Sequence, residues 1–443
     1  MKSDGRAADV IIVGGGFSGT MLAAQLARLG RSSIIVEGRN RAGKGTAFST
    51  PEQVHLLNVP AAKMSAWPDR PDDFADSVAG EGYESTHFVP RRRFGSYLTS
   101  ILDDALASGR VAVVQGEAIS TSPRGERWEV ALDNGSGLDC SALVLAQGNQ
   151  PPDPLRAAEG ISPELFINDP WSDDGRAAIS TVAASGGDVL IVGTGLTMVD
   201  VVLSLESAGH RGRILALSRR GLVPRAHAPH QPVAVEREEV PHGSVRGLWR
   251  WLRRRGVEAG WRGAVDSLRP HSHVLWRSLD ADQQKRFLRH ARPWWDVHRH
   301  RIAPEVAAVL KRMIGDGQLE IAAGRIKSMR EGNRDLVAGI QRRGTDEVRE
   351  RHFALGLNCT GPLGAIGRTE DGVLKSLFER KMARPDALGI GLDVDERSRV
   401  AGADRLWAVG PLTKGAMWEI VAVPDIRGQV ADVAKDIAEE LGR

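Results

Sequence analysis

Residues 10–26 read VIIVGGGFSGTMLAAQL, a stretch that places four glycines directly behind an apolar, β-branched run. Val10–Val13 is typical of a buried strand, whereas Met21, Leu22, Gln25 and Leu26 recur at helical spacing. The glycines therefore stand at a strand-to-helix turn, the position in which glycine allows a ligand to approach the backbone.

Gly14, Gly16 and Gly19 form the pattern G-x-G-x-x-G. In this pattern the first glycine permits a tight turn, the second lets the backbone approach a pyrophosphate, and the third lets helix and strand pack closely. A second expected strand, residues 33–36, ends in a carboxylate that can accept hydrogen bonds from a ribose. The residues assigned to this adenine dinucleotide site are Gly14, Gly16, Phe17, Ser18, Gly19 and Glu37.

A second copy of the pattern occurs at residues 189–202, VLIVGTGLTMVDVV. Gly193 and Gly195 are followed by Leu196 at the expected start of a helix, but Met198 occupies the third glycine position. The next expected strand, residues 213–217, ends in Ser-Arg-Arg-Gly instead of an acid. Arg219 and Arg220 stand where a 2′-phosphate needs cations, so this site is expected to prefer NADPH over NADH.

The order of these segments predicts the domain organisation. After each glycine turn, strand-alternating segments lead to an apolar strand that ends in glycine, at Gly148 and at Gly361. A further strand at 405–411 and a helix from Pro424 follow the second unit. We expect an α/β fold with two Rossmann-like domains, each with a small β-meander. The FAD-type domain comprises residues 1–155 and 363–443, and the second domain comprises residues 156–362.

Composition bounds the remaining possibilities. Six of the eleven tryptophans lie between residues 231 and 312 among many arginines, which predicts a helical insertion. The 59 Lys and Arg residues nearly balance 56 Asp and Glu residues, so no nucleic-acid partner is expected. No apolar run is long enough for a membrane span, two cysteines suit a reducing cytoplasm, and no metal-ligand spacing occurs, so we expect no metal site.

Several segments together resemble a bacterial family of FAD/NAD(P)-binding proteins, which is similar in architecture to class B-like flavin monooxygenases and N-hydroxylases. They are GKGTAFST, HLLNVPAAKMSAWP, FVPRRRFGSYL, GTGLTMVD, WWDVHRHR and NCTGP. The resemblance implies FAD at Gly14–Gly19 and Glu37, and NADPH at Gly193, Gly195, Arg219 and Arg220. It also implies crossover points between the domains at Gly148 and Gly361, and walls around the isoalloxazine at residues 55–60 and 410–424, the latter including Gly410.

If FAD lies on the first turn, its ring extends across the carboxyl ends of the sheet. The helix N-terminus at Pro424 and Asp425 is then placed to stabilise negative charge on reduced flavin. Asn58 is expected to supply an amide, and His55 an imidazole, to the ring or to bound oxygen species. Arg91–Arg93 could bind a carboxylate bidentately, but we favour a role at FAD or in solvent.

The leading hypothesis is an NADPH-dependent flavin monooxygenase that hydroxylates a small substrate, with amines as the expected class, using O₂ through a flavin C4a-hydroperoxide. The absence of a C-x-x-C or similar pair excludes a flavin-coupled dithiol reductase. Three alternatives remain open: a reductase that passes electrons to a protein partner, an oxidase or dehydrogenase with a vestigial second site, and a non-catalytic sensor. A homo-oligomer is possible under each of these hypotheses.

Overall fold

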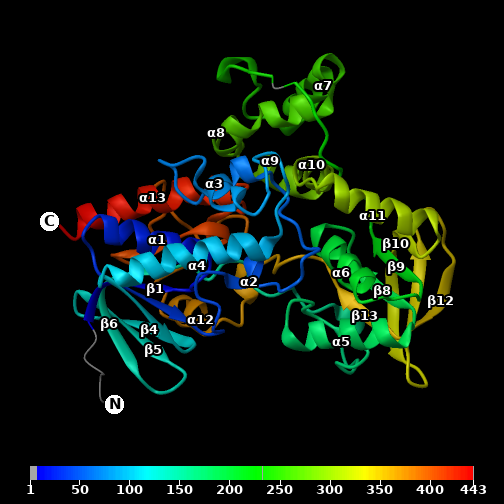
Figure 1. Cartoon of the computed structure of the whole chain (residues 1–443), viewed down its shortest axis with the longest axis horizontal. Helices are drawn as coiled ribbons and strands as arrows, with labels where there is room; N and C mark the ends of the chain where they lie inside the picture. The colour runs from blue at the N-terminus through cyan, green and yellow to red at the C-terminus, as the bar shows by residue number, and fades with distance from the viewer. Residues whose placement is uncertain (1–6, 232, 443) are drawn as a thin grey trace.

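The computed structural model describes residues 7–231 and 233–442. Two seven-stranded sheets organise the chain, and each sheet begins with a parallel, Rossmann-like set of strands. Figure 1 shows the two sheets side by side, with a group of helices standing above them. The predicted fold, an α/β protein with two dinucleotide-binding units and a helical insertion, is confirmed.

The first sheet has the order β3-β2-β1-β6-β5-β4, and its seventh strand, β14, pairs with β6 outside this linear order. The parallel strands are β1 (Ala7–Val13), β2 (Ser33–Glu37), β3 (Val111–Gln115), β6 (Gly137–Leu145) and β14 (Leu406–Ala408). β4 (Ala118–Arg124) and β5 (Arg127–Leu132) join β6 as an antiparallel meander. β14 comes from the end of the chain, so the C-terminal segment completes the first sheet.

Alternating side chains of the first sheet pack on its two faces. Val10 and Ile12 face a cluster formed with α1 (Phe17–Arg28), α4 (Arg91–Ala107) and α13 (Val423–Glu440). Ile11 and Val13 face the opposite side, where the meander and α12 (Gly372–Glu379) cover them. The burial of both faces explains why β1 has a continuous apolar sequence instead of an alternating one.

The second sheet has the order β12-β11-β10-β9-β8-β13-β7. Its parallel strands are β7 (Phe166–Ile167), β8 (Val189–Val192), β9 (Ile214–Ser218), β10 (Leu319–Glu331) and β13 (Leu355–Asn358). β11 (Leu336–Arg342) and β12 (Val348–Phe353) form its antiparallel meander with the second half of β10. Helices α5 (Asp173–Ser185), α6 (Leu196–Ser207) and α11 (Pro304–Gly315) pack on one face.

The insertion between β9 and β10 is helical, as predicted. It contains α7 (Val245–Ser267), α8 (Ser272–Ser278), α9 (Ala281–Arg286), a π-helical turn (Phe287–Ala291) and α10 (Arg292–Arg299). The predicted end at residue 312 requires correction, because Val306, Leu310 and Met313 of α11 pack into the core of the second sheet. α11 is the crossover helix that two parallel strands, β9 and β10, require.

The remaining elements are short. They are α2 (Gly45–Phe48), α3 (Asp73–Ala79) and 3₁₀ turns at Ala61–Lys63, Arg156–Ala158, Arg237–Glu239, Arg269–His271, Ile366–Arg368 and Gly410–Thr413. Among the helices of the described residues, none combines the length and the apolar character that crossing a membrane requires.

Candidate functional site

The first glycine turn is shaped by the protein's own backbone at two of its three glycines. The Gly14 N–H donates to the Val36 carbonyl at 2.9 Å, and Gly14 has a φ of +107°. A Cβ on Gly14 would lie 2.6 Å from the Ala146 carbonyl oxygen, and one on Gly19 would lie 1.9 Å from the Gly14 carbonyl oxygen. A Cβ on Gly16 would meet only the Gly45 Cα, at 3.6 Å. Gly16 is therefore the glycine with space in front of it.

The helices that follow both glycine turns begin without a side-chain cap. The N-cap residues Gly16 of α1 and Gly195 of α6 have no side chain to accept from the first N–H groups. Elsewhere in the chain, Ser172, Asp280 and Asp371 accept such a hydrogen bond at the starts of α5, α9 and α12. The uncapped N–H groups of α1 and α6 are suited to bind phosphate.

Glu37 and Gly410 lie beside the first turn. The carboxylate of Glu37 is 8% exposed and accepts from the Gly15 and Arg39 N–H groups, each at 2.9 Å. Each carboxylate oxygen has capacity for a further hydrogen bond, which leaves the predicted ribose contact chemically open. Gly410 follows β14, and a Cβ there would lie 2.8 Å from the Ser18 Oγ. Its N–H donates at 2.7 Å to Gln429 of α13.

The second glycine turn repeats the geometry of the first. The Gly193 N–H donates to the Leu217 carbonyl at 2.8 Å, φ is +118°, and a Cβ would lie 2.1 Å from the Cys359 carbonyl oxygen. A Cβ on Gly195 would meet no atom within 4 Å. Met198, at the third glycine position, lies in the first turn of α6 and is fully buried in the core of the domain. Its side chain points into the domain and leaves the mouth of the turn open.

The residues after β9 are held against this turn. Ser218 Oγ lies 2.8 Å from Thr194 Oγ1 and accepts from the Gly221 N–H at 2.9 Å. Arg219 is exposed and Arg220 is half-buried. In the described part of the chain, neither has a carboxylate within the 4.0 Å that defines an ion pair. Both cations are available to an external anion beside the turn.

The glycines at the predicted crossover points follow the ends of β6 and β13. Gly148 has a φ of +71° and Gly361 a φ of +92°, so each chain turns away from its sheet through the left-handed region. A Cβ on either glycine would meet no atom within 4 Å. Their requirement for glycine is therefore conformational.

The structure does not support the predicted contact between His55 and the flavin ring. The imidazole is 1% exposed, its Nδ1 lies 2.8 Å from the Thr50 hydroxyl, and its Nε2 donates to the Asp200 carbonyl at 3.1 Å. Both ring nitrogens of His55 are therefore engaged: Nδ1 by Thr50 within the first domain, and Nε2 in a contact between the two domains, because Asp200 belongs to α6.

Asn58 remains half-buried, and the His227 ring donates to its backbone carbonyl at 3.0 Å. Burial lowers the pKa of His227 to about 4, so this imidazole is neutral at pH 7. The backbone of Asn58 is thereby tied to the segment that follows β9, whereas its side-chain amide is not part of that contact.

Arg91 makes an interdomain contact that the sequence did not reveal. Its guanidinium binds the Asp200 carboxylate with two hydrogen bonds of 2.9 Å, and both side chains are largely buried, at 14% and 7% exposure. The sequence had suggested that Arg91–Arg93 contact FAD or solvent. Arg91 does bind a carboxylate bidentately, but the carboxylate belongs to the same chain. No local sequence pattern identifies this pair, because its two residues lie in helices that are far apart in the sequence.

A charged cluster lies at the N-terminus of α13. Glu419 is buried with a φ of +75°, and its carboxylate accepts from Arg299 Nε at 2.8 Å and from the Trp295 indole N–H. Asp425 lies in the first turn of α13, 3.9 Å from Arg299, and burial raises the pKa of its carboxyl. The N-terminus predicted to face the flavin is therefore held by side chains from α10.

The two cysteines are free and buried in different domains, Cys140 in β6 and Cys359 after β13. Burial raises the pKa of Cys140 to about 12 and also raises the pKa of Cys359. Within residues 7–231 and 233–442, no group of three His, Cys, Asp or Glu side chains is arranged to hold a metal ion.

Comparison with known proteins agrees with this geometry. Residues 11–150 match a family model described as FAD-NAD(P)-binding. No curated protein sequence matches the chain. The family model therefore covers the first glycine turn, with Gly14–Gly19, as well as Glu37 and the strands up to β6.

Similar solved structures extend over nearly the whole chain. L-lysine 6-monooxygenase from Pseudomonas syringae is 16% identical with a TM-score of 0.69, and the match covers 98% of this chain and 99% of that chain. The ornithine N-hydroxylase of Kutzneria sp. 744, with reduced FAD, NADP⁺ and L-ornithine, is 14% identical with a TM-score of 0.68, covering 98% and 100%.

A bacillithiol disulfide reductase from Staphylococcus aureus is 13% identical with a TM-score of 0.60, covering 98% of this chain and 99% of that chain. These likenesses establish the fold. Residues 11–150 therefore form an FAD/NAD(P)-binding domain, and the chain as a whole has the fold of the L-lysine 6-monooxygenase, the ornithine N-hydroxylase and the bacillithiol disulfide reductase.

Proposed function

We propose that the protein is an FAD-containing, NADPH-dependent monooxygenase that hydroxylates a small amine. The observation that carries the proposal is the pair of uncapped glycine turns, one on each sheet, in a chain whose only two cysteines are buried apart. In this proposal residues 1–155 and 363–443 hold FAD, and residues 156–362 hold NADPH.

Each cofactor has a distinct set of protein groups. The N–H groups of Phe17, Ser18 and Gly19 bind the FAD pyrophosphate, and Glu37 accepts from the adenosine ribose. The N–H groups that begin α6 bind the NADPH pyrophosphate, while Arg219 and Arg220 bind the 2′-phosphate. Bound FAD supplies hydride acceptance from NADPH and activation of O₂, which no side chain of the protein can provide.

The protein groups near the flavin and the substrate would position the reactants and not react themselves. The half-buried side-chain amide of Asn58 can orient the substrate or the flavin, since only its backbone carbonyl is engaged by His227. In this proposal, the dipole at the N-terminus of α13 helps to stabilise negative charge on the ring. Water exclusion is the remaining task, because a dry site would favour oxygen transfer to the substrate over release of hydrogen peroxide.

Two observations favour oxygen transfer to an amine over the other reactions of this fold. A dithiol reductase needs two cysteines that can form a disulfide next to the flavin, and Cys140 and Cys359 are buried in separate sheets. In addition, the L-lysine 6-monooxygenase and the ornithine N-hydroxylase have TM-scores of 0.69 and 0.68, against 0.60 for the bacillithiol disulfide reductase. The substrates named for those enzymes suggest amines as the first class to test.

The decisive experiment begins with the visible spectrum of the purified protein and an anaerobic titration with NADPH and with NADH. We expect a bound flavin that NADPH bleaches at lower concentration than NADH. Admission of O₂ with a panel of amines should then yield a product 16 mass units heavier, detected by mass spectrometry, in proportion to the NADPH consumed.

Other outcomes contradict the proposal in distinct ways. A colourless protein that cannot be loaded with FAD would exclude any flavin-dependent reaction. Flavin that is reduced by substrate but not by NADPH indicates an oxidase or dehydrogenase. Rapid electron transfer to an artificial acceptor, without any hydroxylated amine, indicates a reductase.

A further inference from the structure

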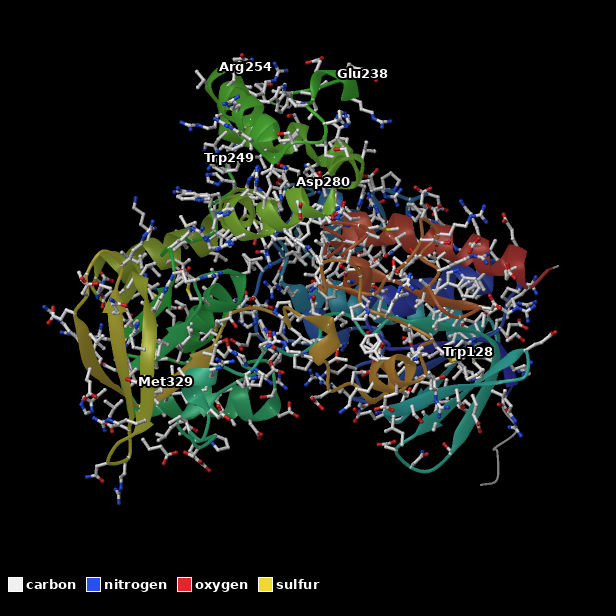
Figure 2. All side chains as sticks on the ribbon, turned by 180° about the vertical axis from the view of Figure 1, so that it is seen from behind. Trp128, Glu238, Trp249, Arg254, Asp280 and Met329 are labelled. Carbon is white, nitrogen blue, oxygen red and sulfur yellow. The ribbon has the colours of Figure 1, made fainter. Side chains whose placement is uncertain are left out.

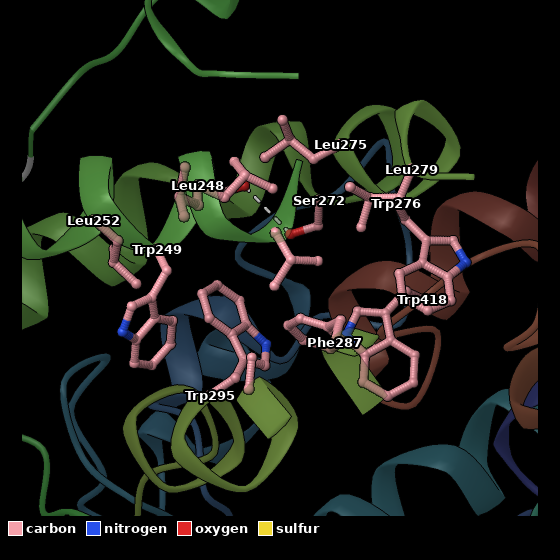
Figure 3. Close-up of a pocket in the computed structure, with 13 residues that line it drawn as sticks. Leu248, Trp249, Leu252, Ser272, Leu275, Trp276, Leu279, Phe287, Trp295 and Trp418 are labelled. Carbon is pink, nitrogen blue, oxygen red and sulfur yellow. Dashed lines mark hydrogen bonds between the residues drawn. The ribbon is translucent and has the colours of Figure 1, made fainter. Parts of the chain in front are cut away.

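An apolar pocket lies between the helical insertion and the segment that precedes α13. We call it the insertion pocket and define it by Trp249 and Leu252 of α7, Trp276 of α8, Phe287, Trp295 of α10, and Trp418. Figure 3 shows the side chains of Trp249, Trp295, Phe287 and Trp418 arranged around one space. The cavity volume is about 80 Å³, several times the space that a single buried water needs, so the pocket has room for a small apolar group.

The lining of the insertion pocket is uncharged. All of its lining residues are apolar except Ser272, and the Ser272 hydroxyl donates to the Leu268 carbonyl at 3.3 Å. The insertion is otherwise rich in arginine, and Figure 2 shows Arg254 and Glu238 at its outer end, with Trp249 nearer the rest of the molecule. The segment has therefore separated its charges from this hollow, and a charged ligand group would lose hydration there without a partner.

The pocket is joined to the FAD-binding part of the chain through Trp418. The Trp418 ring stacks on Trp276 with centroids 4.9 Å apart, and the Trp276 indole N–H donates to the Gly415 carbonyl at 2.7 Å. Glu419, the next residue, is bound by the indole N–H of Trp295. Trp418 thus connects the pocket to the segment between Gly410, where a Cβ would lie 2.8 Å from the Ser18 Oγ, and the N-terminus of α13.

One polar atom of the pocket wall has no partner. The indole Nε1 of Trp418 is buried and makes no hydrogen bond within the described residues. An unmade hydrogen bond at a buried donor costs free energy, and tryptophan in cores and interfaces usually finds an acceptor. A ligand with an acceptor next to its apolar part would satisfy this donor.

We propose that the insertion pocket binds the uncharged part of the substrate, an aromatic or aliphatic group with a hydrogen-bond acceptor beside it. This inference rests on the proposed monooxygenase function and narrows its substrate from amines in general to amines with an apolar substituent. Dicationic amines and zwitterionic amino acids with charged side chains are disfavoured, because the pocket offers their second charge no counter-ion.

The experiment measures binding of n-alkylamines from propylamine to hexylamine, of 2-phenylethylamine and of putrescine to the FAD-loaded protein by calorimetry, without NADPH. Each methylene placed in the pocket should tighten binding about fourfold. Putrescine should bind more weakly than hexylamine. Equal affinities along the alkylamine series, or tighter binding of putrescine, would overturn the inference.

Two matched variants locate the binding site. Leu252→Trp fills the pocket and should weaken hexylamine binding at least tenfold, whereas Val257→Trp on the same helix adds a ring at a residue that is 88% exposed and should have no effect. If Leu252→Trp fails to fold, Trp249→Ala replaces it and should weaken 2-phenylethylamine binding. Unchanged binding in the pocket variant would disprove this location.

A third variant tests the unpartnered donor. Trp418→Phe keeps an aromatic ring but removes the N–H, so it should weaken binding of 2-phenylethanol several-fold and leave binding of ethylbenzene unchanged. Equal effects on both probes would contradict the hydrogen bond. Because these measurements use neither NADPH nor turnover, their failure is distinguishable from failure of NADPH to reduce the flavin, which tests the proposed function itself.

Discussion

At the scale of single residues, the two glycines of the second turn differ in what a methyl group would meet. A Cβ on Gly193 would collide with the Cys359 carbonyl, whereas a Cβ on Gly195 would enter open space. The first glycine is therefore required by the fold, and the second leaves room for a ligand. The same contrast exists between Gly14 or Gly19 and Gly16 in the first turn.

This contrast gives a prediction for Gly195→Ala. The variant should have the same thermal unfolding temperature and the same flavin spectrum as the unmodified protein. Its Michaelis constant for NADPH, however, should be about tenfold higher or more. The reason is that the added methyl group occupies the approach of the pyrophosphate to the backbone. Gly193→Ala is the matched comparison and should lose thermal stability. Loss of stability in Gly195→Ala would show that the position is structural.

The arginines after β9 give a second prediction. Replacing Arg219 and Arg220 by Ala should raise the Michaelis constant for NADPH and spare that for NADH, since each charge-assisted hydrogen bond is worth about 1.5–3 kcal/mol. Steady-state kinetics with both nucleotides measures the ratio. Arg254→Ala, at the outer end of the insertion, is the control and should change neither constant. Equal losses for NADPH and NADH would refute a 2′-phosphate site.

His227 makes stability depend on pH. Its pKa is lowered by burial from 6.5 to about 4, so the unfolded chain binds the proton more readily than the folded one between these values. The stability that neutral His227 contributes is complete above pH 6.5 and is lost as the pH falls toward 4. Thermal unfolding of His227→Gln should therefore show a weaker decline over this range than the unmodified protein. Parallel declines would contradict the assignment.

At the scale of elements, α4 and α6 are joined by Arg91 and Asp200. α6 starts at the second glycine turn and α4 packs on the first sheet, so this pair fixes the nucleotide-binding helix against the FAD-binding domain. His55 and Ser204 reinforce the same contact, with His55 Nε2 3.1 Å from the Ser204 hydroxyl. The orientation of the two domains is thereby linked to a few buried polar groups.

Breaking the Arg91–Asp200 pair should lower the stability of the protein and slow the reduction of the flavin by NADPH. Arg91→Ala leaves the Asp200 carboxylate buried without its partner and should lower the free energy of unfolding by about 3 kcal/mol. Anaerobic reduction of the flavin by NADPH should slow while bound flavin is retained. Arg93→Ala removes an exposed pair with Glu81 and should cost less than about 1 kcal/mol. Equal effects of the two variants would contradict the proposed role of Arg91.

The elements themselves were largely predictable from the sequence. Strand, turn and helix at residues 10–29 and 189–207 follow from local apolar periodicity and glycine spacing, which the chain expresses within a few residues. The Arg91–Asp200 pair joins positions 109 residues apart, and His55 contacts Asp200 of α6 across 145 residues. Such contacts depend on how whole domains pack, so a local pattern could not distinguish His55 at a flavin ring from His55 at a domain interface.

At the scale of the whole molecule, the chain leaves the first domain after β6 and returns to it only with α12, β14 and α13. The composition change between residues 231 and 312 identified the insertion, but it could not separate α11 from the preceding helices. α11 has an apolar face like the others, and only its packing against β8 and β10 assigns it to the second sheet. Boundaries of this kind are properties of the assembled core.

The interleaved arrangement predicts which segments each cofactor protects from hydrogen exchange. Loading FAD should slow amide exchange at residues 14–19 and, far away in the sequence, at residues 410–425, because Gly410 and α13 adjoin the first turn. Adding NADP⁺ to the FAD-loaded protein should slow exchange at residues 193–198 and 218–221. Mass spectrometry of peptides with and without each ligand measures both effects. If FAD protected only residues 14–19, the prediction that residues 410–425 adjoin the flavin site would be wrong. If NADP⁺ protected the first glycine turn, that turn would be the NADPH site and not the FAD site.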